Sequence, residues 1–253
     1  MLRAIARYIP DSFGHALSAT PPDPPIDVAL AQRQHLRYLH ALAECGVAVT
    51  TLAADEHCPD CVFVEDTAIV IRQIGLITRP GAPSRRAETP PIATALDAWV
   101  DVIPMIEPAT LDGGDVMRIG ERIFVGRSAR TNDAGIVQLV AAFAPHGYQV
   151  IPVELPPDVL HLKCVVSPLG GDRILLAENS IPADVFGSVQ IVSVAGEEAY
   201  AANCVAIGDH VIVPEGFPHT HAALVAAGFT LHEVPCSEVR KADGSLTCQS
   251  IIF

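Results

Sequence analysis

The sequence predicts an α/β fold, a five-bladed propeller in which five ββαβ units close a ring within one domain, residues 1–253. Two observations carry this prediction. Short apolar strands occur in pairs around tight turns, and after the clearest pair come an amphipathic helix and a third strand. The pattern begins near residues 67, 116, 164 and 203. Repeats of about 20 to 50 residues are typical of propellers, because each unit buries its apolar face only against its neighbours.

The two ends of the chain predict the first unit. A strand over residues 2–9 is expected to pair with a C-terminal strand near residues 249–253. A helix over residues 28–45 follows and ends before Gly46, since glycine readily adopts the conformation that closes a helix. A strand over residues 47–52 completes the unit. The C-terminal strand would therefore close the first blade and, with it, the ring.

The third unit is the most regular of the remaining four. Strands Val116–Ile119 and 122–125 flank Gly120 and Glu121, a dipeptide typical of a tight hairpin. Its other elements are a helix from a cap at Thr131 or Asn132 to about Pro145, and a strand over residues 148–153.

The second unit shows the same order, with strands 67–72 and 75–79, a helix within 87–99 and a strand over 101–106. The fourth and fifth units begin near Cys164 and Asn203. An ordinary α/β sheet with regular spacing is the alternative architecture.

The composition describes a globular chain with an acidic surface. Half of the residues are hydrophobic and the formal net charge is −13, so the chain can bury a full core. The charge disfavours nucleic acid and anionic membranes as partners, since phosphate binding depends on clustered Lys and Arg. No apolar run approaches the roughly 20 residues of a membrane span, and no signal-peptide core follows the first residues. We therefore expect a cytoplasmic enzyme with a cationic small-molecule substrate.

The seven cysteines are an odd number at irregular spacing, which fits reduced thiols better than a disulfide framework. Cys58 and Cys61 form a CxxC pair, but a metal site needs further ligands, and no second CxxC or HxxxH follows at a suitable spacing. The sequence therefore predicts no metal site.

Polar residues precede the first strand of four units: Asp66, Asp112, His161 and Cys248. In a closed ring these positions lie at one end of the central axis, so the four side chains would meet. A cysteine with a pKa near about 8.5 is mostly protonated at neutral pH and needs a partner to act as a nucleophile. His161 can be that partner, because the pKa of histidine lies near the operating pH. A histidine between apolar residues can also be a core residue, but its equivalence to Cys248 in the repeat favours catalysis.

Opposite charges at the two ends of the predicted pocket indicate the class of ligand. The acids are Asp60, Glu65, Asp66 and Asp112, and the arginines are Arg85, Arg86 and Arg130. Carboxylates bind a planar guanidinium through paired hydrogen bonds, and arginines bind a carboxylate in the same way. Each residue taken alone is also consistent with a surface turn or salt bridge. Together they describe a ligand similar to arginine.

Seven motifs resemble the dimethylarginine dimethylaminohydrolases of the guanidine-modifying, or pentein, superfamily. They occur in the order typical of the family and cover nearly the whole chain. Any one of them is weak, and the set is specific. In sequence order they are FVED (63–66), TRPG with SRR (78–86), LDGGDV (111–116), SARTN (128–132), LHLK (160–163), AANC (201–204) and DGSLTC (243–248).

The resemblance implies a pentein fold and a hydrolase that needs no cofactor. Such an enzyme converts N-omega-methylated arginine to citrulline and a methylamine through a covalent thiouronium on Cys248. His161 would be the general acid and base, and Asp112 would orient His161 or share the guanidinium. The substrate-binding residues that the resemblance implies are Leu17, Asp60, Glu65, Asp66, Arg85, Arg130 and Ala242. Leu17 falls where the family has a mobile lid, and Ala242 where a backbone group touches the ligand. A possible homodimer and a connection to nitric oxide regulation follow from the same resemblance.

Two alternatives stay open at the level of sequence. The first is a related guanidine hydrolase that acts on free arginine or agmatine, although such relatives are usually longer. Clamping by Arg85 and Arg130 disfavours agmatine, which has no carboxylate. The second is a non-catalytic binding protein on the same fold, such as a ribosome anti-association factor, for which a net charge of −13 is unfavourable against RNA.

Overall fold

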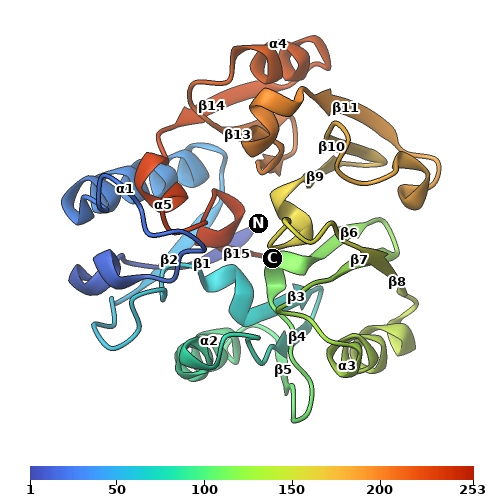
Figure 1. Ribbon diagram of the computed structural model, residues 1–253. Helices are drawn as coiled ribbons and strands as arrows, with labels where there is room; N and C mark the ends of the chain where they lie inside the picture. Colours follow the sequence, from blue (N-terminus) through green and yellow to red (C-terminus); the bar gives the residue numbers. More distant parts are fainter.

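The computed structural model describes all 253 residues, and its fifteen strands form five three-stranded sheets around a central axis (Figure 1). In each sheet the first two strands are antiparallel, and the third is parallel to the second. The strands are β15 (Ile251–Ile252), β1 (Arg3–Arg7) and β2 (Ala48–Leu52); β3 (Ala68–Ile71), β4 (Ile74–Ile77) and β5 (Asp101–Pro104); β6 (Val116–Ile119), β7 (Arg122–Arg127) and β8 (Gln149–Glu154); β9 (Val166–Gly170), β10 (Arg173–Ala177) and β11 (Gln190–Val194); and β12 (Val205–Ile207), β13 (His210–Pro214) and β14 (Thr230–Val234). The predicted α/β ring of five repeated units is confirmed.

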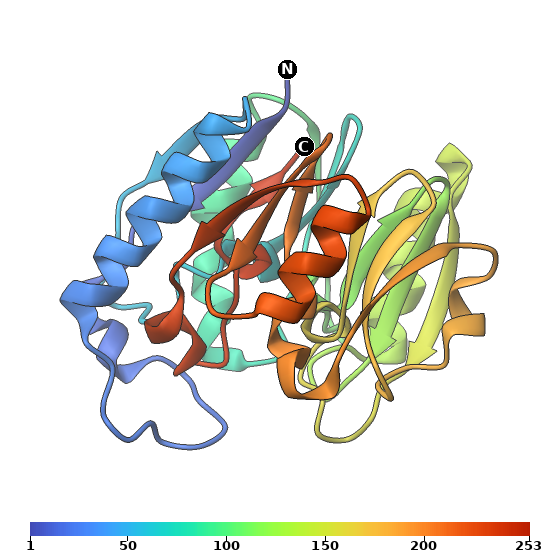
Figure 2. The same ribbon diagram turned by 90° about the horizontal axis from the view of Figure 1, so that it is seen from above.

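The two ends of the chain meet in one sheet. In the β15–β1 pair, Ile252 lies opposite Ala4 and Ile251 opposite Ile5. Both termini lie at one face of the ring, and the long loop before α1 (Val28–Glu44) hangs from the opposite face (Figure 2).

Four of the blades carry an α-helix on the outside of the ring (Figure 1). These helices are α1, α2 (Thr89–Leu96), α3 (Asp133–Phe143) and α4 (Pro218–Ala226); the short α5 (Ser237–Arg240) follows β14. Of the two predicted caps of α3, Asn132 is the one that begins the helix: its side chain accepts a hydrogen bond from the Gly135 amide.

The fourth blade departs from the predicted pattern, because a 3-10 helix, Ala183–Phe186, replaces the α-helix there. Only residues 178–189 join β10 to β11. A crossover between parallel strands needs about a dozen residues or more, so this connection is too short to hold an α-helix as well as its turns.

The hairpins of four blades turn at equivalent positions. Gly120, Gly171 and Gly208 each follow the first strand of their blade with φ of 58°, 58° and 59°, and Arg72 occupies the same position with φ of 55°. This left-handed conformation is favourable for glycine and strained for other residues. The backbone conformation at this turn therefore repeats from blade to blade, although the blades share little sequence.

The apolar core lies between blades. Tyr38 and Leu42 of α1 share a buried cluster with Val205 and Ile212 of the neighbouring blade. Burial of each such side chain contributes about 1.5 to 3 kcal/mol to the free energy of folding. Most of that burial would be lost if one blade stood alone. None of the helices combines the length and the apolar character that crossing a bilayer requires.

Candidate active site

Four short 3-10 helices bring the predicted polar residues to one end of the axis. Each lies before the first strand of a blade: Val64–Thr67 before β3, Gly113–Asp115 before β6, Leu162–Cys164 before β9 and Thr247–Gln249 before β15. Asp66 and Cys248 lie within these turns, and Asp112 and His161 immediately precede theirs. The ring therefore places side chains from distant parts of the chain around one point.

A cavity of about 180 Å³ lies between these turns. Nine of the ten residues predicted for the site line it: Leu17, Asp60, Asp66, Asp112, Arg85, Arg130, His161, Ala242 and Cys248. Its wall is completed by Ser18, Ala19, Phe63, Leu160, Asp243 and Gly244.

His161 is held as an imidazolium by buried carboxylates. Its Nε2 lies 3.1 Å from Asp112 Oδ2, and Asp112 Oδ1 accepts a hydrogen bond of 2.8 Å from the Gly81 amide. Burial alone would lower the pKa of His161, but Asp66, the hydrogen bond to Asp112 and the charge of Asp115 outweigh it and raise the pKa to about 9. The Nδ1 atom makes no hydrogen bond within the chain, so it is the nitrogen free to exchange a proton with a ligand.

Asp66 remains an anion despite being 2% exposed. Its Oδ1 accepts a hydrogen bond of 2.9 Å from the Gly114 amide, and its Oδ2 accepts one of 2.6 Å from Arg85 Nη1. Burial acts to raise the pKa of Asp66, but the charges of His161 and Arg85 lower it to about 2. The carboxylate is thus ionised at neutral pH, and it lines the same cavity as the Cys248 thiol.

Arg85 is tied into the wall by a second carboxylate. Its Nε and Nη2 donate to Glu88, its Nη2 also donates to the Phe63 carbonyl, and its Nη1 donates to Asp66. Burial raises the pKa of Glu88 to about 7, against the opposing effect of Arg85. One N–H of Nη1 is left for a ligand.

The Cys248 thiol is protonated at neutral pH. Burial, followed by the charges of Glu65 and Asp66, raises its pKa well above the usual value for a thiol. His161, Arg85 and Arg130 share the cavity with the sulfur, and their charges do not outweigh these effects. A cationic ligand bound at Asp66 would oppose the same carboxylates and lower the pKa of Cys248.

Glu65 does not line the cavity, contrary to the prediction. Its side chain binds the Lys163 ammonium through Oε1 and accepts a hydrogen bond of 2.7 Å from Thr247 Oγ1 through Oε2. The 3-10 turn directs Asp66 into the cavity, and the preceding residue therefore points to the other side. Glu65 instead ties the turn before β3 to the turn that carries Cys248.

Arg130 contributes a free positive charge to the cavity. The guanidinium of Arg130 lines the cavity and makes neither an ion pair nor a hydrogen bond within the chain. Asp60 Oδ1 accepts a hydrogen bond of 3.0 Å from the Leu17 amide, which holds the N-terminal loop over the opening. Ala242 lies buried beside it, at the start of the turn that continues to Asp243.

Sequence reasoning missed two residues of the site. Glu88 anchors Arg85, and its position three residues after Arg85 was a signal for an ion pair on one helical face. Asp243 accepts a hydrogen bond from the Ala19 amide and so connects the N-terminal loop to the turn before Cys248. No pattern in the sequence relates those two positions, because the contact depends on closure of the ring.

Asp66, Asp112 and His161 are close enough to hold a cation, with one donor atom from each within 4.8 Å of the others. All four carboxylate oxygens already accept hydrogen bonds, from Gly114, Arg85, Gly81 and His161. A planar guanidinium matches this site, because its N–H groups donate paired hydrogen bonds to carboxylates.

Comparison with known proteins agrees with this chemistry. A family model described as N,N dimethylarginine dimethylhydrolase, eukaryotic, matches residues 24–210. The N(G),N(G)-dimethylarginine dimethylaminohydrolase of Pseudomonas aeruginosa is 39% identical over 229 residues, which cover 90% of this chain and 90% of that protein. The protein of the same name from Streptomyces coelicolor is 38% identical over 228 residues, covering 89% of this chain and 87% of that one.

Solved structures show the same fold. The dimethylarginine dimethylaminohydrolase of Pseudomonas aeruginosa, as a cysteine-to-serine mutant complexed with citrulline, superposes with a TM-score of 0.94 at 37% identity and covers 99% of this chain and 98% of that chain. The N-terminal domain of ArgZ, a cyanobacterial arginine dihydrolase, superposes with a TM-score of 0.90 at 17% identity, covering 100% of this chain and 98% of that chain. The resemblance inferred from the seven motifs is confirmed.

Proposed function

The chain belongs to the dimethylarginine dimethylaminohydrolase family, and from that premise we propose that it hydrolyses N-omega-methylated arginine to citrulline and a methylamine. One observation carries the proposal. A thiol, an imidazolium–carboxylate pair and an ionised carboxylate meet in one cavity, which an unpaired arginine, Arg130, also lines.

The charges of the cavity orient the substrate. The guanidinium binds Asp66, whose carboxylate stays ionised with a pKa of about 2. The α-carboxylate binds Arg130, supported by the remaining N–H of Arg85 Nη1, and the α-ammonium binds Asp60 and the loop at Leu17. This orientation brings the guanidinium carbon to Cys248.

Binding of the substrate supplies the charge that forms the nucleophile. Burial and the carboxylates of Glu65 and Asp66 hold the pKa of Cys248 high. A guanidinium beside the sulfur stabilises the thiolate, and the thiol proton passes to water as the thiolate forms. The thiolate then attacks the guanidinium carbon, forming a carbon–sulfur bond and a tetrahedral adduct held by Asp66.

His161 completes both half-reactions. His161 is protonated at neutral pH, because its pKa is about 9. It donates its proton to the departing amine as the carbon–nitrogen bond breaks, and this step leaves a thiouronium on Cys248. The neutral imidazole then accepts a proton from water as the water oxygen attacks the same carbon. Collapse of this second adduct breaks the carbon–sulfur bond and releases citrulline. Asp112 positions the ring through both steps.

Two measurements test this function. Steady-state rates on dimethylarginine, monomethylarginine, arginine and agmatine identify the substrate: preference for methylated arginine supports the proposal, and preference for arginine or agmatine replaces it with a related guanidine hydrolase. Mass spectrometry of protein quenched during turnover should show a covalent increment on the peptide that contains Cys248. Cys248→Ser should retain the fold and show neither turnover nor the increment.

We further propose that the protein acts in the cytoplasm, without nucleic acid as a partner and as a homodimer. The net charge of −13 supports the exclusion of nucleic acid, the odd number of irregularly spaced cysteines supports the location, and the family resemblance supports the dimer. Light scattering of the purified protein measures its mass directly, and a monomer at micromolar concentration would contradict the dimer.

A further inference from the structure

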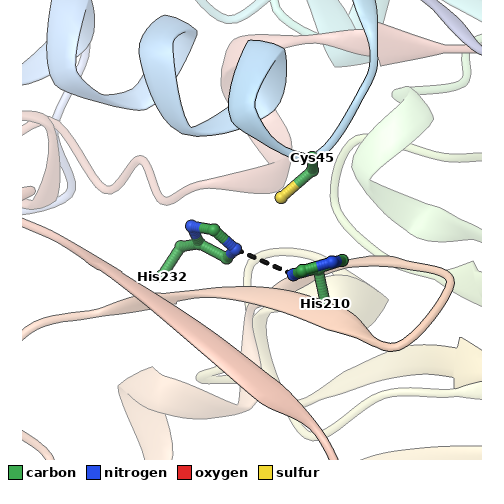
Figure 3. A group of neighbouring side chains, drawn as sticks. All are labelled: Cys45, His210 and His232. Atoms are coloured by element: carbon green, nitrogen blue, oxygen red, sulfur yellow. Dashed lines mark hydrogen bonds between the residues drawn. The ribbon is translucent and has the colours of Figure 1, made fainter.

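A second group of metal-binding side chains lies outside the cavity, at the seam between two neighbouring blades. Cys45 directly follows α1, which connects β1 to β2, while His210 begins β13 and His232 lies in the adjacent β14. The two parallel strands pair so that His232 lies opposite Ile212, and both histidines therefore face α1. The sulfur of Cys45 points toward the two imidazole rings (Figure 3).

The spacing of the three groups is close to that of a tetrahedral zinc site. His210 Nδ1 and His232 Nε2 are 3.0 Å apart, and one donor atom from each of the three residues lies within 4.8 Å of the others. Two nitrogens bound to zinc at about 2.0 to 2.1 Å would be roughly 3.3 Å apart, and a sulfur at about 2.3 Å would be roughly 3.6 Å from each of them. Cys45 is only half-buried and lies at a helix end, where its side chain can approach the two nitrogens to close the site.

A carboxylate orients one of the ligands. Glu44 Oε2 lies 3.6 Å from His232 Nδ1, while Nε2 of the same ring faces His210. A histidine that binds a metal through one nitrogen commonly directs the other toward a carboxylate, which fixes the ring and its tautomer. The partial negative charge at the C-terminus of the 17-residue α1 also favours a cation at this place.

We propose that Cys45, His210 and His232 bind a zinc ion, with water as the fourth ligand and Glu44 as the outer carboxylate that orients His232. Binding releases the thiol proton of Cys45, and His210 carries its ring proton on Nε2 so that Nδ1 is free for the metal. The ion joins α1 of the first blade to β13 and β14 of the last, and therefore stabilises the seam at which the ring closes. The inference is independent of the reaction in the cavity. The sequence concealed the site because its ligands come from distant segments.

Metal titration of the full-length protein tests the site. The Cys248→Ser protein is used as the background, so that the thiol of the cavity cannot bind metal. We expect one equivalent of Co²⁺ with the absorption of a cobalt–thiolate bond, and a rise in the melting temperature with Zn²⁺. Adding Cys45→Ser or His232→Ala should abolish both signals. Glu44→Gln should weaken zinc binding by about 10- to 100-fold, the range typical of outer carboxylates.

Two matched controls locate the metal. Cys164 is half-buried like Cys45 but has no such pair of histidines, and His146 lies on the surface; Cys164→Ser and His146→Ala should bind metal unchanged. Absence of binding, or binding that survives Cys45→Ser, overturns the proposal. If a variant fails to fold, alkylation of the Cys248→Ser protein by iodoacetamide tests the site instead. Zinc should protect the peptide containing Cys45 from alkylation. Equal labelling with and without zinc overturns the proposal.

Discussion

Asp112 is expected to hold His161 in its protonated form, and Asp112→Asn tests this. The amide of asparagine is nearly the same size as the carboxylate, so the hydrogen bond from Gly81 can be kept while the charge is removed. The new side chain can also present an N–H to His161 Nε2, which now lies 3.1 Å from the Asp112 carboxylate. The variant therefore removes the negative charge beside the imidazole and favours its neutral form.

The structure allows the size of the effect to be worked out. The pKa of His161 is raised from the usual 6.5 to about 9 although burial opposes this, a net stabilisation of the imidazolium by about 3 kcal/mol at about 1.4 kcal/mol per pKa unit. Loss of one charge at close range typically changes a pKa by about 1 to 3 units. Asp66 and Asp115 remain, so we expect the pKa of His161 to fall toward the usual value for histidine. The value of kcat should fall on the order of 100-fold or more.

Nuclear magnetic resonance titration of protein labelled at histidine measures this pKa directly, with the His161 signal identified by its absence from His161→Phe. Asp112→Glu is the matched control, because it keeps the charge and should keep the pKa of His161 close to the wild-type value even where the longer side chain lowers kcat. A pKa in Asp112→Asn equal to that of the wild type would refute the reasoning.

Three further predictions follow from the same site. Gly114→Ala should lower kcat at least about 10-fold with the fold retained by circular dichroism, because a Cβ there would lie 2.6 Å from His161 Nδ1; unchanged kcat would show that the ring can move freely. Arg85→Ala should destabilise the protein by about 3 to 5 kcal/mol in urea unfolding, since it leaves two buried carboxylates without their partner, and a loss below about 1 kcal/mol would contradict this. The stabilising contribution of His161 should be complete below about pH 6.5 and lost as the pH rises through about 9; urea unfolding across this range should show a smaller decline in His161→Phe than in the wild type.

Local patterns in the sequence were enough to predict the blades. Alternating apolar residues, glycines at hairpins and a polar cap at Asn132 depend only on neighbours along the chain, and the hairpin at Gly120 and helix α3 lie within a few residues of their predicted bounds. The fourth blade departed from the repeat because only residues 178–189 join β10 to β11, which leaves room for the 3-10 helix Ala183–Phe186 and not for an α-helix.

The repeat also predicted which residues would meet. Asp66, Asp112, His161 and Cys248 occupy equivalent positions before the first strands of their blades, and rotation about the axis brings equivalent positions together. This part of the site follows from counting residues between repeats, which is information that the sequence contains.

Only the tertiary structure decided the directions and partners of individual side chains. Whether Glu65 or its neighbour faces the cavity depends on the backbone of one 3-10 turn, and the pairing of Arg85 with two carboxylates depends on how that turn packs against the next. The approach of Cys45 to His210 and His232 depends on closure of the first blade against the last. These are long-range contacts set by packing of the whole ring, whereas hydrophobic periodicity and turn propensity act over a few residues. For that reason the sequence alone determines the repeat, and the tertiary structure determines the chemistry where the blades meet.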